Sequence, residues 1–222
     1  MPKSVVIYTS SEAFSALRTL ARQGATGSAI KPYTFSFAQK TESGSIRVRA
    51  SEISEGAVLP AIADMVKRGE ATLASAADRD VRAATYEELI GEADRTRRVA
   101  RLQWTSPTCV DLGGQSVPFP VMPLIFARYR EVWSAFSPAR LPGGAEQALD
   151  HVQVTDFKIS CAAGPFGPGA KGWVTVEMEK GRTEQEIALF NGLIDFAFYC
   201  GTGLHTEEGL GQTRRMEPQQ RG

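Results

Sequence analysis

Hydrophobic residues in the first third of the chain recur with two different spacings, which predict alternating strands and helices. Around 13–20 and around 59–66 the apolar residues lie three and four positions apart, as on one face of a helix. Thr9 and Glu12 match a capping box at the start of the first helix. Alternating or β-branched segments predict strands at 4–10, 33–40, 45–50 and 71–75. The order is therefore β-α-β-β-α-β, which is the order of the ferredoxin-like unit.

The same order recurs in the second half of the chain. Helical spacing predicts helices at 122–136 and 183–199, the second with a Thr183–Glu186 capping box. Strand patterns lie at 98–106, 149–160, 172–179 and 208–216. Because the halves share an element order, we expect an α+β protein of tandem ferredoxin-like (βαββαβ) domains. The boundary falls within the polar segment 90–97, which gives an N-terminal domain of residues 1–94 and a C-terminal domain of residues 95–222.

Charge and cysteine content narrow the class of protein. The 222 residues include 25 basic and 25 acidic side chains, so bulk attraction to nucleic acid is not expected, although arginines can still cluster on one face. Cys109, Cys161 and Cys200 are odd in number and far apart, which indicates buried, reduced thiols and argues against a structural metal site. We also expect no cofactor. No apolar run approaches the ~18 residues that a membrane span needs. We expect a cytoplasmic protein that does not enter a membrane.

Glycine and hydrogen-bonding side chains concentrate in "YCGTGLHTEEGLGQTRRM", residues 199–216. Glycines let a backbone approach phosphates closely, and successive N–H groups can then form a concave anion-binding nest. The alternative is a glycine-rich connector that closes the domain. Histidine side chains titrate in the physiological range, so His205 could serve as base, acid or phosphate ligand. Arg214 and Arg215 are adjacent, so on a strand they would face opposite ways.

Three segments resemble, in the same order, those of the CRISPR-associated endoribonucleases that cut repeat RNA to release guide RNAs. "KPYTFSFAQ" (31–39) resembles that family's first hairpin strand, and "TSPTCVDLGGQSVPFPVMPLIFARYREVW" (105–133) resembles its central segment. "FAFYCGTGLHTEEGLGQTRR" (196–215) resembles its signature, G-x-G-x-K-T followed after a short spacer by G-x-G-Q-x-R. One glycine pattern alone is a weak signal, whereas three ordered segments are fairly specific. The matching signature residues are Gly201, Gly203, Thr206, Gly209, Gly211, Gln212 and Arg214.

The resemblance implies a metal-independent endoribonuclease that binds a CRISPR repeat hairpin RNA and cleaves at its 3′ base. The 2′-hydroxyl would attack the adjacent phosphate to leave a 2′,3′-cyclic phosphate, and the guide RNA would stay bound, with other CRISPR effector subunits as partners. Each implied contact also has a structural interpretation, because Lys31 could merely solubilise a turn and the glycines could form a connector. The implied RNA-binding residues are Lys31, Gly201, Gly203, His205, Thr206, Gly209, Gly211, Gln212, Arg214 and Arg215.

The sequence departs from the family at the usual general base, a histidine shortly before the Lys-Pro pair. The corresponding segment "RQGATGSAIKP" (22–32) has no histidine, and His151, interpreted as structural, and His205 are the only two in the chain. In this respect the chain resembles the arginine-dependent guide-RNA-processing subunits of type IV systems. The catalytic candidates are therefore Arg22 and Arg18, which share a helix face, and His205, which stands where lysine is usual.

Other interpretations stay open at this stage. The two arginines could lie on a solvated helix face. The whole chain could be a catalytically inactive hairpin-binding subunit of a CRISPR effector complex, since the usual histidine is absent. A tandem ferredoxin-like protein that binds a small ligand or another protein is the remaining alternative, and its arginines would be scattered.

Overall fold

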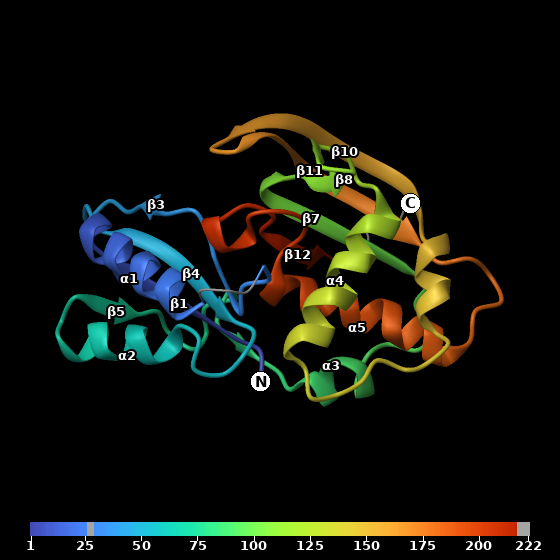
Figure 1. Cartoon of the computed structure of the whole chain (residues 1–222), viewed down its shortest axis with the longest axis horizontal. Helices are drawn as coiled ribbons and strands as arrows, with labels where there is room; N and C mark the ends of the chain where they lie inside the picture. Colours follow the sequence, from blue (N-terminus) through green and yellow to red (C-terminus); the bar gives the residue numbers. More distant parts are fainter. Residues whose placement is uncertain (26–28, 217–222) are drawn as a thin grey trace.

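The computed structural model describes residues 1–25 and 29–216 of the chain. Figure 1 shows the N-terminal half beside the C-terminal half. The elements of the first half are β1 (Lys3–Thr9), α1 (Ser11–Gly24), β2 (Tyr33–Phe35), β3 (Gln39–Lys40), β4 (Ile46–Glu52), α2 (Leu59–Lys67), β5 (Ala71–Leu73), β6 (Arg82–Ala83) and α3 (Tyr86–Gly91). Those of the second half are β7 (Val99–Thr108), β8 (Val110–Leu112), β9 (Gln115–Val117), α4 (Met122–Phe136), the 3₁₀ helix η1 (Glu146–His151), β10 (Gln153–Gly164), β11 (Gly167–Glu177), α5 (Glu184–Cys200), the 3₁₀ helix η2 (Thr206–Glu208) and β12 (Thr213–Met216).

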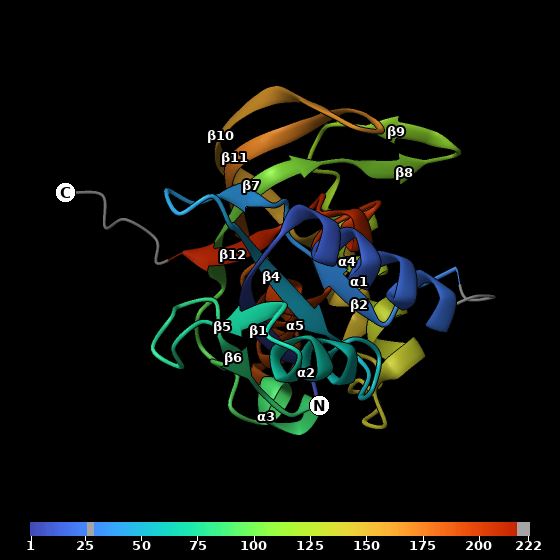
Figure 2. The same cartoon turned by 90° about the vertical axis from the view of Figure 1, so that its left-hand side faces the viewer.

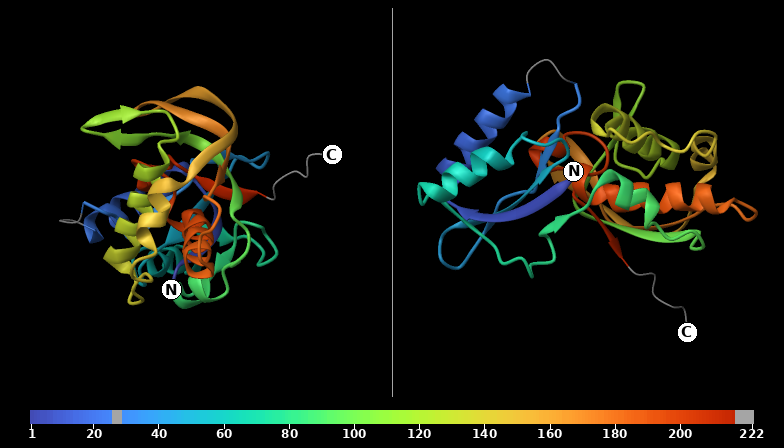
Figure 3. Two further views of the ribbon diagram at one scale, coloured as in Figure 1. Left: turned by 90° about the vertical axis from the view of Figure 1, so that its right-hand side faces the viewer. Right: turned by 90° about the horizontal axis from the view of Figure 1, so that it is seen from below.

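Both halves contain an antiparallel sheet with the same strand order. In the first half the order is β2-β4-β1-β5, with β3 paired to the beginning of β4 and β6 to the beginning of β1. In the second half the order is β10-β11-β7-β12, while β8 and β9 form a separate hairpin. Within each β-α-β-β-α-β unit, both orders run second, third, first and fourth strand, which confirms the tandem ferredoxin-like α+β fold. Helices α1 and α2 cover one face of the first sheet, and α4 and α5 cover one face of the second (Figure 3).

Helix α1 begins one residue later than the sequence pattern predicts. Ser10 is its N-cap, because the Ser10 hydroxyl oxygen accepts the N–H of Ala13 at 3.1 Å. Thr9 instead ends β1 and donates its hydroxyl to the carbonyl oxygen of Glu70 at 2.7 Å. The expected capping box at Thr9 and Glu12 is therefore wrong, since the threonine hydroxyl is already used by a neighbouring strand end.

Other boundaries are confirmed in part. The Thr183–Glu186 capping box opens α5 as expected. The strand expected at 149–160 begins only at Gln153, because η1 occupies the residues before it, and the strand expected at 208–216 shortens to β12. The burial expected of the cysteines is wrong for Cys161, which lies exposed on β10.

Each half has its own hydrophobic core, and helix α3 packs with the second. The Tyr86 ring of α3 lies 4.8 Å from that of Trp133 in α4, and its hydroxyl donates to the carbonyl oxygen of Ile53 at 2.9 Å. Tyr86 and Leu89 belong to the cluster of the second half although they precede it in the chain. The domain boundary at residue 94 stays a prediction. The first core includes Phe14, Leu17, Phe35, Val48, Ile62 and Met65.

The two halves meet where β12 and the loop before it lie against the first sheet (Figure 2). Gln212 bridges them, since its side-chain oxygen accepts a hydrogen bond from Arg49 and its amide donates to the carbonyl oxygen of Phe35 at 3.0 Å. The Gln212 carbonyl oxygen accepts the N–H of Thr105 in β7 at 2.8 Å. Arg49 is only 3% exposed, and burial lowers its pKa to about 10. The contact between the halves is therefore polar, buried and specific.

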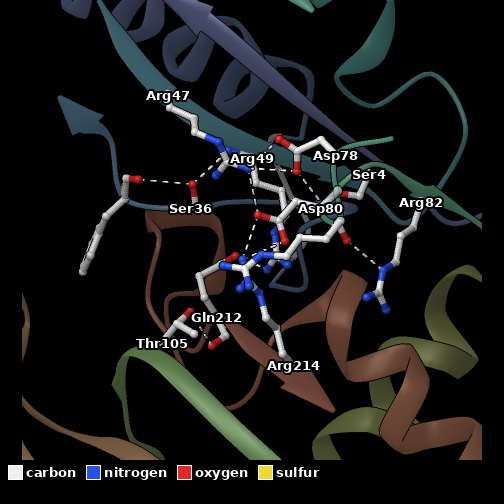
Figure 4. Close-up of polar contacts among 12 residues, drawn as sticks. Ser4, Ser36, Arg47, Arg49, Asp78, Asp80, Arg82, Thr105, Gln212 and Arg214 are labelled. Atoms are coloured by element: carbon white, nitrogen blue, oxygen red, sulfur yellow. Dashed lines mark hydrogen bonds and ion pairs between the residues drawn. The ribbon is translucent and has the colours of Figure 1, made fainter. Parts of the chain in front are cut away.

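Two aspartates of the first half hold the arginines at this junction (Figure 4). Arg214 of β12 donates from Nη2 to both carboxylate oxygens of Asp80, each at 2.7 Å. Arg47 of β4 donates from Nη2 to Asp80 and to Asp78, each at 3.0 Å. We call Arg47, Arg49, Asp78, Asp80, Gln212 and Arg214 the interdomain network.

Candidate functional site

Two predicted arginines on helix α1 meet the glycine-rich loop of the other half. Arg22 donates to Oε1 of Glu208 from Nη2 at 2.5 Å and from Nε at 3.0 Å, and Arg18 forms an ion pair with Oε2 of the same carboxylate. The Glu208 side chain is 12% exposed, whereas those of Arg18 and Arg22 are 31% and 53% exposed. The carboxylate thus lies beneath the two guanidinium groups, which keep outer edges in solvent.

Tyr33 of β2 lies beside these charges. Its hydroxyl is buried and has no hydrogen-bond partner within the described part of the chain. Burial raises the pKa of Tyr33, and Glu207 raises it further, while Arg22 and Arg18 act in the opposite direction. Burial lowers the pKa of Arg18, and the nearby Arg22 adds to this effect. We call Arg18, Arg22, Tyr33, Glu207 and Glu208 the α1–loop cluster.

The glycines of the loop fold it back onto the segment between β7 and β8. Gly203 and Gly211 have φ of 81° and 64°, values that residues with a side chain rarely adopt. A Cβ at Gly203 would lie 1.9 Å from the carbonyl oxygen of Cys109, and one at Gly211 would lie 2.0 Å from that of Thr202. The N–H of Gly211 donates to the carbonyl oxygen of Pro107 at 3.0 Å. These glycines are therefore required by internal packing.

The other two glycines of the signature are also covered by neighbouring side chains. A Cβ at Gly201 would lie 2.8 Å from Cγ2 of Thr206, and one at Gly209 would lie 2.5 Å from the ring of Phe37. The N–H of Gly201, the C-cap of α5, donates to the carbonyl oxygen of Ala197, and that of Gly209 donates to the carbonyl oxygen of Thr206. These amides are engaged inside the protein and are not presented as a nest. Thr206 thus also has a packing role.

His205 holds a half-buried position at the corner of the loop. Its φ is 56°, the left-handed region. Its carbonyl oxygen accepts the N–H of Glu208 at 3.0 Å and of Leu210 at 3.3 Å, which fixes the corner. Its ring stacks on that of Phe166, at the turn between β10 and β11, with 4.2 Å between centroids and 17° between planes.

The remaining predicted residues have partners inside the protein. Lys31 donates to the carbonyl oxygen of Ala25 at 2.8 Å, which closes the segment after α1. Arg215 lies on the opposite side of β12 from Arg214, as expected, and its guanidinium reaches Asp195 at 3.1 Å and Asn191 at 2.6 Å. Together with the interdomain network, these contacts give Gln212, Arg214 and Arg215 structural roles.

A groove runs along the other side of the loop. Its volume is about 460 Å³, and it lies between α4, β8 and the loop. Apolar side chains form much of its wall, while Arg128 and Glu131 of α4 pair at 2.6 Å on its rim. The lining also includes Ala29, Val110, Leu124, Gly203 and Leu204.

The sequence does not identify three residues of the site, and one predicted segment lies partly outside the described residues. Glu208 and Phe166 are ordinary loop residues until folding places them against α1 and His205. Tyr33 lies in a predicted strand, which the structure confirms, but the sequence does not indicate that the charges of Arg18, Arg22 and Glu207 act on its hydroxyl. Residues 26–28, part of the segment where the family's histidine is usual, lie outside the described residues.

The described residues contain neither a candidate metal-ligand cluster nor a candidate membrane-spanning helix. Within residues 1–25 and 29–216, no group of three or more His, Cys, Asp or Glu side chains could hold a metal ion. In the same ranges, no helix has the length and apolar character to cross a membrane. His151 ends η1, and its side chain lies 3.9 Å from Glu179 at the surface.

Comparison with known proteins connects this geometry to a family. The chain is similar over nearly its full length to "Cas6 (TTHA0078) substrate mimic complex", with 21% identity, a TM-score of 0.79, and 97% of this chain and 99% of the other covered. It is also similar to "Cas6 (TTHB231) product complex", with 21% identity, a TM-score of 0.79 and the same coverage. A third similar structure is "Thermus thermophilus Cas6 (TTHB231)", with 21% identity, a TM-score of 0.73, and 97% of this chain and 98% of the other covered. At these identities the similarity establishes the fold.

The family itself is established by sequence. No curated protein matches the chain. The model of the family "CRISPR-associated endoribonuclease Cas6" matches residues 102–213, just over half of the 222 residues. The match extends from β7 to the start of β12 and so includes the glycine-rich loop. The chain therefore belongs to the CRISPR-associated endoribonuclease Cas6 family.

Proposed function

We propose that this protein is a metal-independent endoribonuclease that binds the hairpin of a CRISPR repeat RNA and cleaves at its 3′ base to release guide RNA. Membership of the Cas6 endoribonuclease family supports the reaction class. Similar structures are named as substrate mimic and product complexes, which supports RNA as the ligand. The observation that carries the proposal is the meeting of Arg18 and Arg22 with the glycine-rich loop at Glu208.

The chemistry needs an oriented 2′-hydroxyl and charge stabilisation. In-line attack of that hydroxyl on the adjacent phosphorus breaks the bond to the 5′-oxygen and leaves a 2′,3′-cyclic phosphate and a 5′-hydroxyl. The outer edges of Arg18 and Arg22 can donate to the phosphate oxygens as negative charge develops. Arginine is a poor proton acceptor because its pKa exceeds ~12, so a site built on arginines acts slowly. We expect single-turnover processing with the product retained.

We expect the side chains of the loop to contact the RNA, because the N–H groups of Gly201, Gly209 and Gly211 already donate to carbonyl oxygens of the protein. His205 and Thr206 lie at the loop corner, and Lys31 lies on the segment after α1. Hairpin RNA is recognised largely through A-form shape, phosphates and 2′-hydroxyls, which suits distributed basic side chains. Retention of the guide RNA would bring this chain, in the cytoplasm, together with other CRISPR effector subunits. The absence of a histidine in 22–32 favours the type IV subgroup.

The test uses repeat RNA from the protein's own locus. Purified protein in excess over RNA should cut it in EDTA, and the product should carry a 2′,3′-cyclic phosphate. A 2′-deoxy substitution at the cut site should abolish cleavage with little loss of affinity, because it removes only the nucleophile. Loss of cleavage in EDTA with rescue by Mg²⁺, or cutting of the deoxy substrate, would contradict the mechanism. Tight binding without any cleavage would make the chain an inactive hairpin-binding subunit.

A further inference from the structure

The Phe166–His205 stack joins two segments that are distant in sequence. Phe166 lies at the turn of the long β10–β11 hairpin, and His205 lies in the glycine-rich loop. The ring centroids are 4.2 Å apart and the planes are within 17°, so one face of each ring covers the other. The hairpin turn is thereby placed against the loop that also contacts α1.

The stack is exposed on its Phe166 side, while His205 is half-buried. Phe166 is 48% exposed although one face of its ring covers His205, so its outer face is open to solvent. An exposed phenylalanine at a hairpin turn adds little to core packing, and a flat open ring is a surface on which another planar group can stack. The geometry therefore offers room for a third ring.

The loop corner holds this arrangement at a conformational cost. His205 adopts a left-handed backbone conformation, which is unfavourable for a residue with a side chain. Two N–H groups, from Glu208 and Leu210, converge on its carbonyl oxygen and fix the turn. Glu208 at the end of the same turn pairs with Arg18 and Arg22. The stacked rings and the two arginines are therefore held by one short 3₁₀ turn.

We propose that the Phe166–His205 pair is a platform on which the base of one unpaired nucleotide stacks, beside the phosphate that Arg18 and Arg22 contact. This inference rests on the proposed function, since it assigns part of the RNA to this surface. Bases of unpaired nucleotides have free faces and stack on aromatic side chains, whereas bases inside a duplex do not. Stacking of this kind tolerates any base, because every base presents a π-face. The platform sets the position of the nucleotide and does not select its identity.

The test compares two phenylalanines of the same hairpin. Phe166→Leu removes the flat ring and keeps apolar bulk, while Phe166→Tyr keeps the ring. Phe157→Leu is the matched control, because Phe157 lies on β10, is 53% exposed and packs edge-on against Phe119 at 6.4 Å. Dissociation constants are measured with repeat RNA made uncleavable by a 2′-deoxy group at the cut site. We expect Phe166→Leu to weaken binding roughly 5- to 150-fold, with Phe166→Tyr and Phe157→Leu near wild type.

A second measurement locates the base. Abasic nucleotides are placed one at a time along the unpaired RNA flanking the hairpin. One position should weaken binding to the wild type and have little further effect on Phe166→Leu, because the two changes remove the same contact. Equal affinity of Phe166→Leu and wild type, an equal loss in Phe157→Leu, or no sensitivity at any of the unpaired positions would overturn the platform. If the wild type neither binds nor cuts repeat RNA, the proposed function fails first, and the two failures are thus distinguishable.

Discussion

Arg214 places one nitrogen, Nη2, 2.7 Å from both carboxylate oxygens of Asp80, across the junction between the two halves. The Asp80 side chain is 2% exposed, so its charge depends on arginine partners for compensation. Burial lowers the pKa of Arg214, and Asp80 opposes that shift. The residue that the family signature suggested for RNA therefore holds β12 to the segment between β5 and β6 of the first half.

Removal of Arg214 should destabilise the protein. Arg214→Ala leaves Asp80 with Arg47 as its remaining arginine partner in the interdomain network, and we expect the free energy of unfolding to fall by about 2–4 kcal/mol. Urea denaturation measures this loss. Arg68→Ala is the control, since Arg68 pairs with Glu70 at the surface and its removal should leave the free energy of unfolding nearly unchanged. An Arg214→Ala protein with unchanged stability and weakened RNA binding would return this side chain to the RNA interface.

Removal of Arg22 should affect the reaction more than the binding of RNA. Arg22→Ala deletes a donor that matters most as charge develops on the phosphate, so we expect single-turnover cleavage about 100-fold slower with a near-normal dissociation constant. Lys67→Ala removes one positive charge from an exposed position on α2 and controls for net charge. If Arg22→Ala loses affinity while bound RNA is cut at the wild-type rate, the Arg22 side chain binds RNA and does not contribute to the cleavage step.

Two glycines with nearly the same φ separate backbone strain from steric overlap. Gly203 and Gly181 have φ of 81° and 82°, but a Cβ would overlap the Cys109 carbonyl only at Gly203 and would meet nothing within 4 Å at Gly181. Gly181→Ala should cost about 1–2 kcal/mol, and Gly203→Ala roughly 1–3 kcal/mol more. Chemical denaturation of both variants gives the comparison, and equal losses would show that the loop relaxes away from Cys109.

The start of α5 should give a pH-dependent stability difference. The N–H of Thr183 holds the pKa of Glu186 below its ordinary value of 4.5, with help from the Thr183 hydroxyl and Arg182. A carboxylate with a depressed folded-state pKa stabilises the fold above about pH 4.5, and this stabilisation is lost as the pH falls through the folded-state value. Glu186→Gln should therefore be about 0.5–1 kcal/mol less stable at pH 7, with the difference narrowing in acid.

Thermal unfolding from pH 7 to pH 3 measures that difference. Glu184→Gln, in the same first turn, controls for the helix dipole that both carboxylates experience. A gap for Glu186→Gln that stays constant with pH would mean that the carboxylate charge is not its source.

Element order and spacing were sufficient for the fold because they are local properties of the chain. The strand and helix periods identified both ferredoxin-like units, and the i, i+4 spacing placed Arg18 and Arg22 on one face. The partner of that face was not predictable, since Glu208 lies in the other half. Arg49 was misleading for a similar reason. In "SIRVRA" it alternates with apolar residues as on the solvent side of a strand, yet Gln212 and the ring of Phe198 from the other half cover it.

Gln212 touches both halves at once, with a side chain bound to Arg49 and Phe35 and a main chain bound to Thr105. These hydrogen bonds tie the glycine-rich loop to both units, so an exchange of one unit must preserve the groups that Gln212 contacts. A chimaera that joins residues 1–94 to the C-terminal half of another relative must bring glutamine opposite Arg49. Without it, a buried guanidinium loses its acceptor. The contact between Gln212 and Arg49 thus limits which C-terminal halves can be combined with this N-terminal half.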